Sequence, residues 1–366
     1  MIIFYARGGC LEKFHPRLLP LLRNGLISYH FRSNSLEEYY LKGGRPEPME
    51  NLILDSGAFS AWNNDAQIDL NEYIAYCLKY LDAITYVVNL DVIPARPGQK
   101  KISAEEIERS ASEGWNNAEK MLRAGIPKSK LIHVFHQGED LKWLQRMVDK
   151  FEYIGLSPAN DRTTQEKKTW LDSCMPYVTD EKGYPLIKFH GFAVTAYTLM
   201  NRYPWFSVDS ATYTQQAGRG VVYIPQYKNG KWQYANMPFL VRIGFNSVFE
   251  KTTDHFENYP VTQQQQFLQY FHEKNIPLGI SSCQQVEKKK GGRNVIGVCQ
   301  MREGCSHKIE DSEQICAEVV VQQGVRNMHP WRTICNAETL NEYEKTVTLW
   351  PKKAFNKESL AFQFEL

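Results

Sequence analysis

Eight short apolar runs recur along the chain, separated by stretches that have helical spacing or a loop-like composition. The runs are continuously apolar rather than alternating, which is typical of strands buried on both faces in a parallel sheet. They span Ile2–Ala6, Leu52–Asp55, Tyr86–Asp91, Leu131–His136, Tyr153–Ser157, Leu186–Gly191, Trp205–Asp209 and Pro277–Ser282. Eight strands that alternate with helices predict an α/β fold of the (β/α)8 TIM-barrel type.

The segments between the runs support this alternation. Helical patterns cover Asp69–Leu81, Ser103–Ala124, Gln137–Lys150 and Thr262–Lys274, and Ser103 with Glu106 forms a capping box. The alternative is an open doubly wound sheet. It is disfavoured because no glycine-rich fingerprint follows the first strand at a helix start.

The region after the seventh expected strand predicts a β-hairpin. Val221–Pro225 and Lys231–Met237 flank Asn229-Gly230, and Asn-Gly is the strongest short hairpin signal. We therefore expect a (β/α)8 barrel domain over residues 1–285, with a hairpin insertion at 221–250. Residues 286–366 are expected to form a basic loop and a C-terminal appendage.

Composition narrows the class of protein. The 366 residues are 43% hydrophobic and 23% charged, as in soluble globular proteins. The net charge is only +2, so any basic surface that binds nucleic acid must be local. No run reaches the roughly 20 apolar residues of a membrane span, and the N-terminus lacks the basic leader of a signal peptide. Eight scattered cysteines are consistent with a reducing cytoplasm, which is the predicted location.

Polar residues stand at the end of nearly every expected strand. They are Asp55, Asp91, His136 with Gln137, Ser157 with Asn160, His190 with Gly191, and Asp209. The carboxyl ends of barrel strands share one face, and that face carries the active site. Single residues of these types also serve as turn formers and helix caps, so the prediction depends on the set.

Six of these segments match a known family in strand order. LDSGAFS is similar to its DSGGF segment, NLDVIP to DEC-P, HQGED to QGG, IGLSPAN to GGL, KFHGFAV to GVG, and VDSATYTQQAGRG to the nucleophile segment with its downstream SGR. The chain thus resembles the tRNA-guanine transglycosylases from about Leu52 to Met237. It more closely resembles their DNA-modifying relatives in phages and bacteria, the deoxypurine-in-DNA protein A family.

The resemblance implies base exchange, in which guanine leaves a nucleic acid and a 7-deazaguanine such as 7-cyano-7-deazaguanine takes its place. It implies Asp209 as the nucleophile that forms a covalent glycosyl intermediate and Asp55 as the group that moves protons. No nucleotide cofactor is required. The residues that we expect to bind the base by hydrogen bonding or stacking are Asp91, Gln137, Gly155, Leu156, Phe59, Tyr213 and Gly191.

DNA is the expected partner, and tRNA is the alternative polymer. Phosphate contacts are expected from local basic residues, namely Arg219, Lys228, Lys231, Lys288, Lys289, Lys290 and Arg293. A duplex target would require the guanine to be flipped out. The expected setting is the cytoplasm of a bacterial cell, with the protein encoded by the bacterium or by a phage.

The chain also departs from the family. Ala58 replaces the second glycine of the first segment, and His136 and His190 lie outside the family pattern. Lys188, on the sixth expected strand, suggests an alternative enzyme class, a barrel lyase or aldolase in which a lysine forms a Schiff base. A catalytically silent nucleic-acid binder is disfavoured because both Asp55 and Asp209 are present.

The family's zinc pattern, C-x-C-x2-C followed by a distant histidine, has no counterpart here. The candidate ligands are Cys283, Cys299, Cys305, His307 and Cys316. Since their spacing does not match known zinc hooks, structural zinc is not expected.

Overall fold

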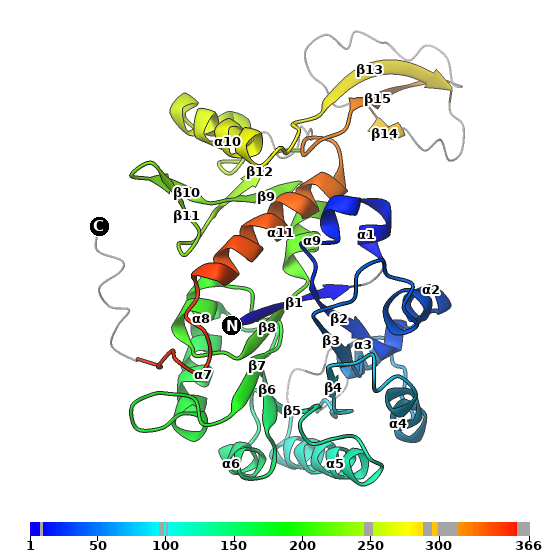
Figure 1. The fold of residues 1–366 in the computed structure, drawn as a ribbon, viewed down its shortest axis with the longest axis vertical. Helices are drawn as coiled ribbons and strands as arrows, with labels where there is room; N and C mark the ends of the chain where they lie inside the picture. Colours follow the sequence, from blue (N-terminus) through cyan, green and yellow to red (C-terminus); the bar gives the residue numbers. More distant parts are fainter. Residues whose placement is uncertain are drawn as a thin grey trace. The chain divides into compact units, whose positions relative to one another are not determined.

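The computed structural model describes residues 1–7, 10–94, 99, 102–244, 252–287, 295–298 and 314–356 (Figure 1). The chain forms two compact units. The first consists of residues 1–211 and 347–366, and the second of residues 212–346. Among the described residues, no helix has the length and apolar character needed to cross a bilayer.

The first unit is a closed barrel of eight parallel strands, as the sequence predicts. Strand β1 pairs with both β2 and β8, with Ile3 opposite Val208, and this pairing closes the barrel. The strands are β1 (Ile2–Arg7), β2 (Asn24–Ser28), β3 (Asn51–Asp55), β4 (Tyr86–Val88), β5 (Leu131–His136), β6 (Tyr153–Ser157), β7 (Lys188–Gly191) and β8 (Ser207–Ser210).

Two strand assignments made from the sequence are wrong. The second barrel strand, Asn24–Ser28, was missed because the segment NGLIS has only two adjacent large apolar residues. Pro277–Ser282 is not the eighth barrel strand, because β13 (Ile280–Glu287) pairs antiparallel with β15 (Gln314–Gln322) in the second unit. Asp55 therefore ends the third strand rather than the second, and Asp209 lies on the eighth rather than the seventh.

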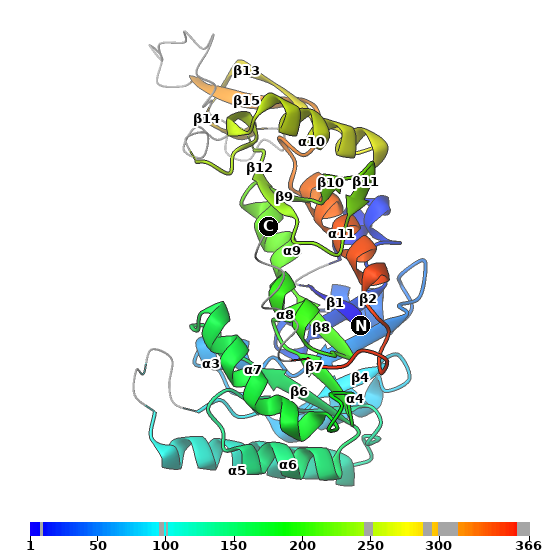
Figure 2. The same ribbon diagram turned by 90° about the vertical axis from the view of Figure 1, so that its left-hand side faces the viewer.

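Helices connect the strands on the outside of the barrel, and Figure 2 shows α5, α6 and α7 in this position. The capping box of Ser103 and Glu106 is present at the start of α5. The helical elements of this unit are α1 (Leu11–Phe14), η1 (Pro16–Leu18), η2 (Tyr29–Phe31), α2 (Asn34–Leu36), η3 (Glu37–Leu41), α3 (Ala58–Asn63), α4 (Leu70–Lys79), α5 (Ala104–Arg123), α6 (Leu141–Lys150), α7 (Thr164–Val178) and α8 (Tyr197–Arg202).

The barrel interior is filled by alternate residues of the strands. One buried cluster contains Phe4, Leu26, Ile53, Val88, Ile132, Val134 and Tyr153. Because side chains alternate along a strand, Asp55 lies on the same side as Ile53, and His136 on the same side as Val134. The alternation therefore directs both polar residues inward at the carboxyl ends of their strands.

The C-terminal segment returns to the first unit after α11 (His329–Thr346). The Trp350 ring packs edge-on against Phe206 at 5.4 Å, and Phe355 stacks on Tyr203 with ring centroids 5.6 Å apart. The Phe355 amide also donates to the Gly183 carbonyl at 2.8 Å. Residues 347–356 thus complete the packing of the unit that contains the barrel.

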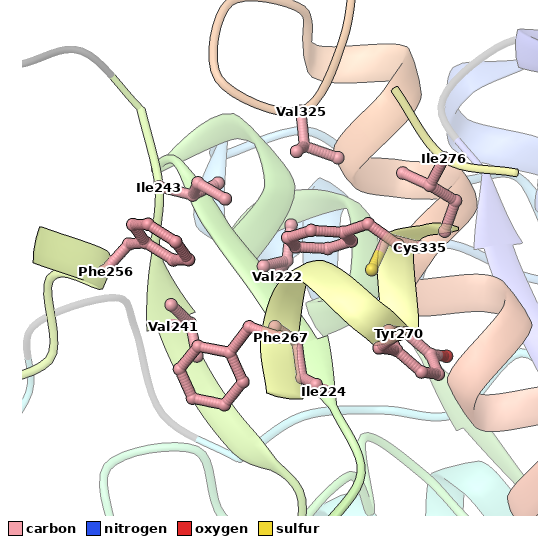
Figure 3. Close-up of a cluster of buried hydrophobic side chains, with 11 residues drawn as sticks. Val222, Ile224, Val241, Ile243, Phe256, Phe267, Tyr270, Ile276, Val325 and Cys335 are labelled. Carbon is pink, nitrogen blue, oxygen red and sulfur yellow. The ribbon is translucent and has the colours of Figure 1, made fainter. Parts of the chain in front are cut away.

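The second unit has its own core, shown in Figure 3, which includes Val222, Val241, Phe267 and Tyr270. The unit contains a three-stranded antiparallel sheet in the order β13-β15-β14 and a paired β9 and β12. Its remaining elements are α9 (Thr212–Gly218), β9 (Val221–Ile224), β10 (Gln226–Lys228), β11 (Lys231–Gln233), β12 (Phe239–Arg242), η4 (Phe256–Asn258), α10 (Val261–Glu273) and β14 (Val295–Val298).

A hairpin forms at the expected Asn229-Gly230 turn, between β10 and β11. The expected first arm, Val221–Pro225, is wrong, because Val221–Ile224 forms β9 and pairs with β12. Asn229 and Gly230 have φ angles of 52° and 73°, and two positive φ angles are what a type I′ turn requires. The hairpin belongs to the second unit and follows the eighth barrel strand rather than the seventh. The division after Ala211 differs from the domain boundary expected at residue 285.

His133 is a buried histidine between β5 and the helices outside it. Its ring lies 5.8 Å from the Trp115 ring and 4.8 Å from the Phe151 ring, between centroids. Among the described residues, neither ring nitrogen has a hydrogen-bond partner. Burial lowers the pKa of His133 to about 3, with a smaller contribution from the charge of His136. The folded protein therefore holds this imidazole neutral at a cost in stability.

We expect His133→Leu to stabilise the protein, because it removes buried polar atoms that lack partners. The gain in the free energy of unfolding should be about 1–2 kcal/mol at pH 7. The unfolded chain takes up a proton on His133 below pH 6.5 while the folded protein does not, so the wild type loses stability as pH falls. The gain should therefore grow by about 2 kcal/mol between pH 7 and pH 5.

Urea unfolding at both pH values measures this difference. The matched control is His272→Leu, since His272 is exposed on α10 and its replacement should leave the pH dependence unchanged. A His133→Leu variant that is less stable than the wild type at pH 5 would contradict the expectation.

Candidate active site at the barrel mouth

Three aspartates lie at the carboxyl ends of barrel strands. Asp55 ends β3, Asp91 follows β4, and Asp209 lies near the end of β8. The Gly57 amide donates to Asp55 Oδ2 at 2.9 Å and holds this carboxyl group at the start of α3. Gly57 has a φ of 78°, and a Cβ there would come within 2.4 Å of the His30 Cβ. This position therefore needs glycine.

Asp55 has an unusual proton affinity. Burial raises its pKa from the ordinary 3.8 to about 7, and the neighbouring charges of Asp91 and Asp209 act in the same direction. The three carboxyl groups are thus close enough to interact electrostatically. A carboxyl group with a pKa near 7 can both donate and accept a proton at neutral pH.

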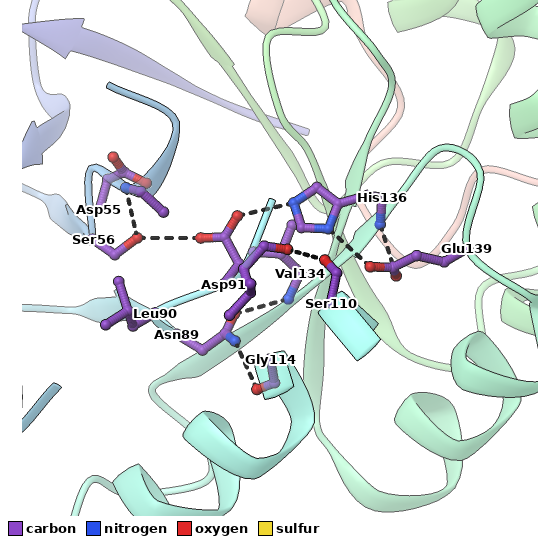
Figure 4. Close-up of polar contacts among 12 residues, drawn as sticks. Asp55, Ser56, Asn89, Leu90, Asp91, Ser110, Gly114, Val134, His136 and Glu139 are labelled. Atoms are coloured by element: carbon purple, nitrogen blue, oxygen red, sulfur yellow. Dashed lines mark hydrogen bonds and ion pairs between the residues drawn. The ribbon is translucent and has the colours of Figure 1, made fainter. Parts of the chain in front are cut away.

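A second cluster joins Asp91, His136 and Glu139 (Figure 4). His136 Nε2 lies 2.9 Å from Asp91 Oδ2, and His136 Nδ1 lies 3.0 Å from Glu139 Oε1. Burial by itself would lower the pKa of His136, but the two carboxylates outweigh it and raise the pKa to about 10. His136 is therefore an imidazolium at neutral pH, and Ser56 Oγ donates to the other Asp91 oxygen at 3.3 Å.

Side chains hold the segment that carries Asp91 in place beyond the end of β4. Asn89 Oδ1 accepts from the Val134 amide at 3.0 Å, and Ser110 Oγ donates to the Val92 carbonyl. These bonds hold the segment that follows Val88, where β4 ends. They position Asp91 beside β5, which carries His136.

Among the described residues, the groups that hold Asp209 all contact one of its carboxylate oxygens. The Ala193 amide donates to Oδ1 at 2.7 Å, and His190 Nε2 lies 3.3 Å from the same oxygen. Ala193 has a φ of 51°, a left-handed conformation that is uncommon for alanine and typical of constrained functional sites. Within the described part of the chain, Oδ2 has no hydrogen bond, so one oxygen is oriented while the other remains available.

Gln137 lies at the same rim as His136. Its amide N–H donates to the Ser157 carbonyl at 3.0 Å, and its side-chain Oε1 accepts from the Ala159 amide at 3.0 Å. With its oxygen satisfied, the side chain has its NH2 group as the remaining donor. This is the polarity that the sequence-based hypothesis requires of Gln137.

The three glycine and leucine positions expected to bind the base are packed rather than open. Gly155 and Leu156 lie within the paired part of β6, and a Cβ on Gly155 would come within 2.2 Å of the Phe192 ring. A Cβ on Gly191 would come within 2.9 Å of Val194 Cγ2. Gly155 therefore admits the Phe192 ring against the strand, and the Leu156 side chain is fully buried.

The two expected stacking residues differ in exposure. Phe59 is 47% exposed on α3, and its ring stacks with Trp62 at 5.9 Å. Tyr213, on α9 of the second unit, is fully buried. Phe59 is thus the one of the two whose ring is accessible.

The basic residues expected to contact phosphates that can be described lie in the second unit. Arg219 follows α9, and Lys228 and Lys231 are exposed partners across the hairpin. The other four expected contacts, Lys288, Lys289, Lys290 and Arg293, lie outside the described residues.

Lys188 does not lie at the barrel mouth. It is the first residue of β7, at the opposite end of the strand from Gly191, and its ammonium group lies 4.9 Å from the centroid of the Phe206 ring. This position gives no support to a Schiff-base lysine at the active-site face.

The candidate zinc ligands fall in segments that the structure does not describe in full. Cys299, Cys305 and His307 lie outside them, as do the side chains of Cys283 and Cys316. In the part of the chain that is described, no group of three or more His, Cys, Asp or Glu residues has an arrangement that could hold a metal ion.

Sequence reasoning missed several members of the site. Glu139 stands three residues after His136, and that spacing was the available signal for an ion pair at the strand end. Ser207, whose hydroxyl lies 2.6 Å from His190 Nδ1, and Tyr153, whose hydroxyl is hydrogen bonded to Ser207, carried no signal, because these contacts depend on which strands are neighbours. No protein-family model matches the chain, and no curated protein matches its sequence significantly.

Proposed function

We propose that this protein is a DNA-guanine transglycosylase, which exchanges guanine in DNA for a 7-deazaguanine base through a covalent intermediate on Asp209. The observation that best supports the proposal is the convergence of two different carboxyl groups at the barrel mouth. Asp209 is oriented through one oxygen, and Asp55 has a pKa of about 7. A glycosidic bond cleaved by a nucleophile and a proton donor needs this pair of roles.

The first half of the exchange breaks the bond between C1′ and the guanine nitrogen. Asp209 Oδ2 attacks C1′, the bonding electron pair leaves with guanine, and a proton from Asp55 neutralises the departing base. The second half runs in reverse with the new base. Asp55, now ionised, takes a proton from the 7-deazaguanine, whose nitrogen attacks C1′ and releases the Asp209 carboxylate. Bonds and protons balance over the cycle, so no external energy source is required.

Recognition of guanine needs acceptors for N1–H and the 2-amino group and a donor for O6. Asp91 supplies the acceptors, and His136 and Ser56 fix the orientation of its carboxylate. The NH2 group of Gln137 supplies the donor, with its oxygen held by the Ala159 amide. The exposed Phe59 ring is suited to stack on an extruded base.

DNA is the proposed polymer because the chain lacks the C-x-C-x2-C pattern of the tRNA enzymes it resembles. A lyase or aldolase that uses Lys188 is not favoured, since this lysine begins its strand.

A base-exchange assay tests the proposal. Double-stranded DNA, single-stranded DNA and tRNA are incubated with the protein and radiolabelled guanine, and label in the recovered polymer is counted. We expect incorporation into DNA and not into tRNA. Incorporation into tRNA alone would favour the alternative polymer, and incorporation into none of the three would contradict a transglycosylase.

A further inference from the structure

A series of hydrogen-bonded, buried side chains leads through the barrel interior to Asp209. Ser207 Oγ lies 2.6 Å from His190 Nδ1 and is hydrogen bonded to the Tyr153 hydroxyl, while His190 Nε2 lies 3.3 Å from Asp209 Oδ1. Tyr153, Ser207 and His190 are fully buried. They come from the consecutive strands β6, β8 and β7, whose register places His190 opposite Ser207. The pairing of these neighbouring strands therefore brings together side chains from three separate parts of the sequence.

The direction of each hydrogen bond follows from the groups at the two ends of the series, the Asp209 carboxylate and the Tyr153 hydroxyl. Asp209 as a carboxylate can only accept, so His190 Nε2 carries the proton. With a neutral imidazole, Nδ1 then accepts from the Ser207 hydroxyl, and Ser207 Oγ accepts from Tyr153. Burial holds the pKa of the Tyr153 phenol well above its ordinary value, so that it remains a donor. This is the assignment in which a neutral ring satisfies every contact.

Packing by itself does not require histidine at this position. The His190 ring packs edge-to-face with the rings of Phe4, Phe192 and Tyr153. The distances between ring centroids are 6.1, 4.5 and 6.5 Å, respectively. A phenylalanine would suit these aromatic surroundings without the cost of burying two ring nitrogens. His133 shows the contrast, because its buried nitrogens have no partner among the described residues. Both ring nitrogens of His190 instead have partners, Ser207 at Nδ1 and Asp209 at Nε2.

We propose that His190 is a positioning residue for the nucleophile: its Nε2–H, held in place by Ser207 and Tyr153, fixes Asp209 Oδ1 and leaves Oδ2 for attack on the sugar. This inference rests on the proposed function. While the ester to C1′ exists, Oδ1 is its carbonyl oxygen. As the incoming base displaces Asp209, the bond from C1′ to Oδ2 breaks, its electron pair returns to the carboxylate, and the His190 and Ala193 donors stabilise that charge.

The first test needs no activity. Nitrogen-15 NMR of the full-length protein labelled on histidine reports the protonation of each ring nitrogen, and the His190 signals are identified by their absence in His190→Phe. We expect the neutral ring to carry its proton on Nε2. In Ser207→Ala the Nδ1–H tautomer should gain population, because the Ser207 hydroxyl that donates to Nδ1, and so favours the Nε2–H tautomer, is lost. A neutral wild-type ring with its proton on Nδ1 would overturn the assignment.

The second test measures the chemistry. In single-turnover reactions on DNA, His190→Phe should slow formation of the covalent adduct about 100-fold, because Oδ2 is no longer held in position for attack, with the Kd for DNA changed less than about twofold. His190→Gln, whose side-chain NH2 can donate from the Nε2 position, should recover most of the rate. Equal loss in both variants, or no loss in either, would contradict a positioning role. If the wild type forms no adduct on any polymer, the proposed function fails, and the tautomer measurement still reports separately on the hydrogen-bond chain.

Discussion

Asp209→Asn should abolish covalent adduct formation and guanine exchange, with a loss of roughly 10⁴-fold or more. An amide is a poor nucleophile, and no other described carboxyl group is held by the donors of Ala193 and His190. The change is nearly isosteric, so the variant should bind DNA with unchanged affinity. Loss of rate without loss of binding would identify Asp209 as the attacking group.

The measurement is a denaturing gel, on which a covalent complex of the protein with labelled DNA migrates as a shifted band. Asp149→Asn is the matched control, because Asp149 is an exposed carboxylate near the end of α6. It should form the band as the wild type does. Exchange that survives both Asp209→Asn and Asp209→Ala would rule out Asp209 as the nucleophile.

Asp55→Asn should reduce exchange by about 10³-fold, because asparagine can neither protonate the leaving guanine nor deprotonate the incoming base. The free wild-type enzyme must carry a proton on Asp55 to begin the cycle. Since the pKa of Asp55 is about 7, the wild-type rate of adduct formation should fall about tenfold per pH unit above pH 7. The residual rate of Asp55→Asn should lack this decline.

The same substitution should change stability in the opposite direction. Between pH 3.8 and about pH 7 the folded protein keeps a proton on Asp55 that the unfolded chain has released, so wild-type stability falls as pH rises through this window. Asparagine has no such loss. We expect Asp55→Asn to be more stable than the wild type by about 2 kcal/mol at pH 9 and about equally stable at pH 4. The value at pH 9 is about half of the free energy that corresponds to the whole pKa shift, because the Asp55 residue is partly exposed to solvent.

Urea unfolding at pH 4 and pH 9 measures this effect, with Asp149→Asn again as the control. A variant that is less stable than the wild type at pH 9 would show that Asp55 is a structural carboxylate rather than a strained catalytic one. Stability and activity that move in opposite directions are typical of a residue retained for chemistry.

The barrel was predictable because strands buried on both faces leave continuous apolar runs, and helix starts leave capping signals such as Ser103 with Glu106. The same criterion failed for β2, where Asn24 and Gly25 weaken the apolar run. It also failed at Pro277–Ser282, an apolar run that does not enter the barrel. An apolar run indicates burial but does not specify which sheet a strand joins.

The amino-acid sequence by itself determined that polar residues end the strands, and it identified Asp55, Asp91, Gln137 and Asp209 as candidates. The tertiary structure decided which of these residues interact. The register of β7 against β8 places His190 between Ser207 and Asp209, and the adjacency of β4 and β5 places His136 beside Asp91. The raised pKa of Asp55 likewise results from burial and from charges that lie 36 and 154 residues away in sequence. Such effects depend on distance in space, which strand pairing sets and which no local pattern of residues encodes.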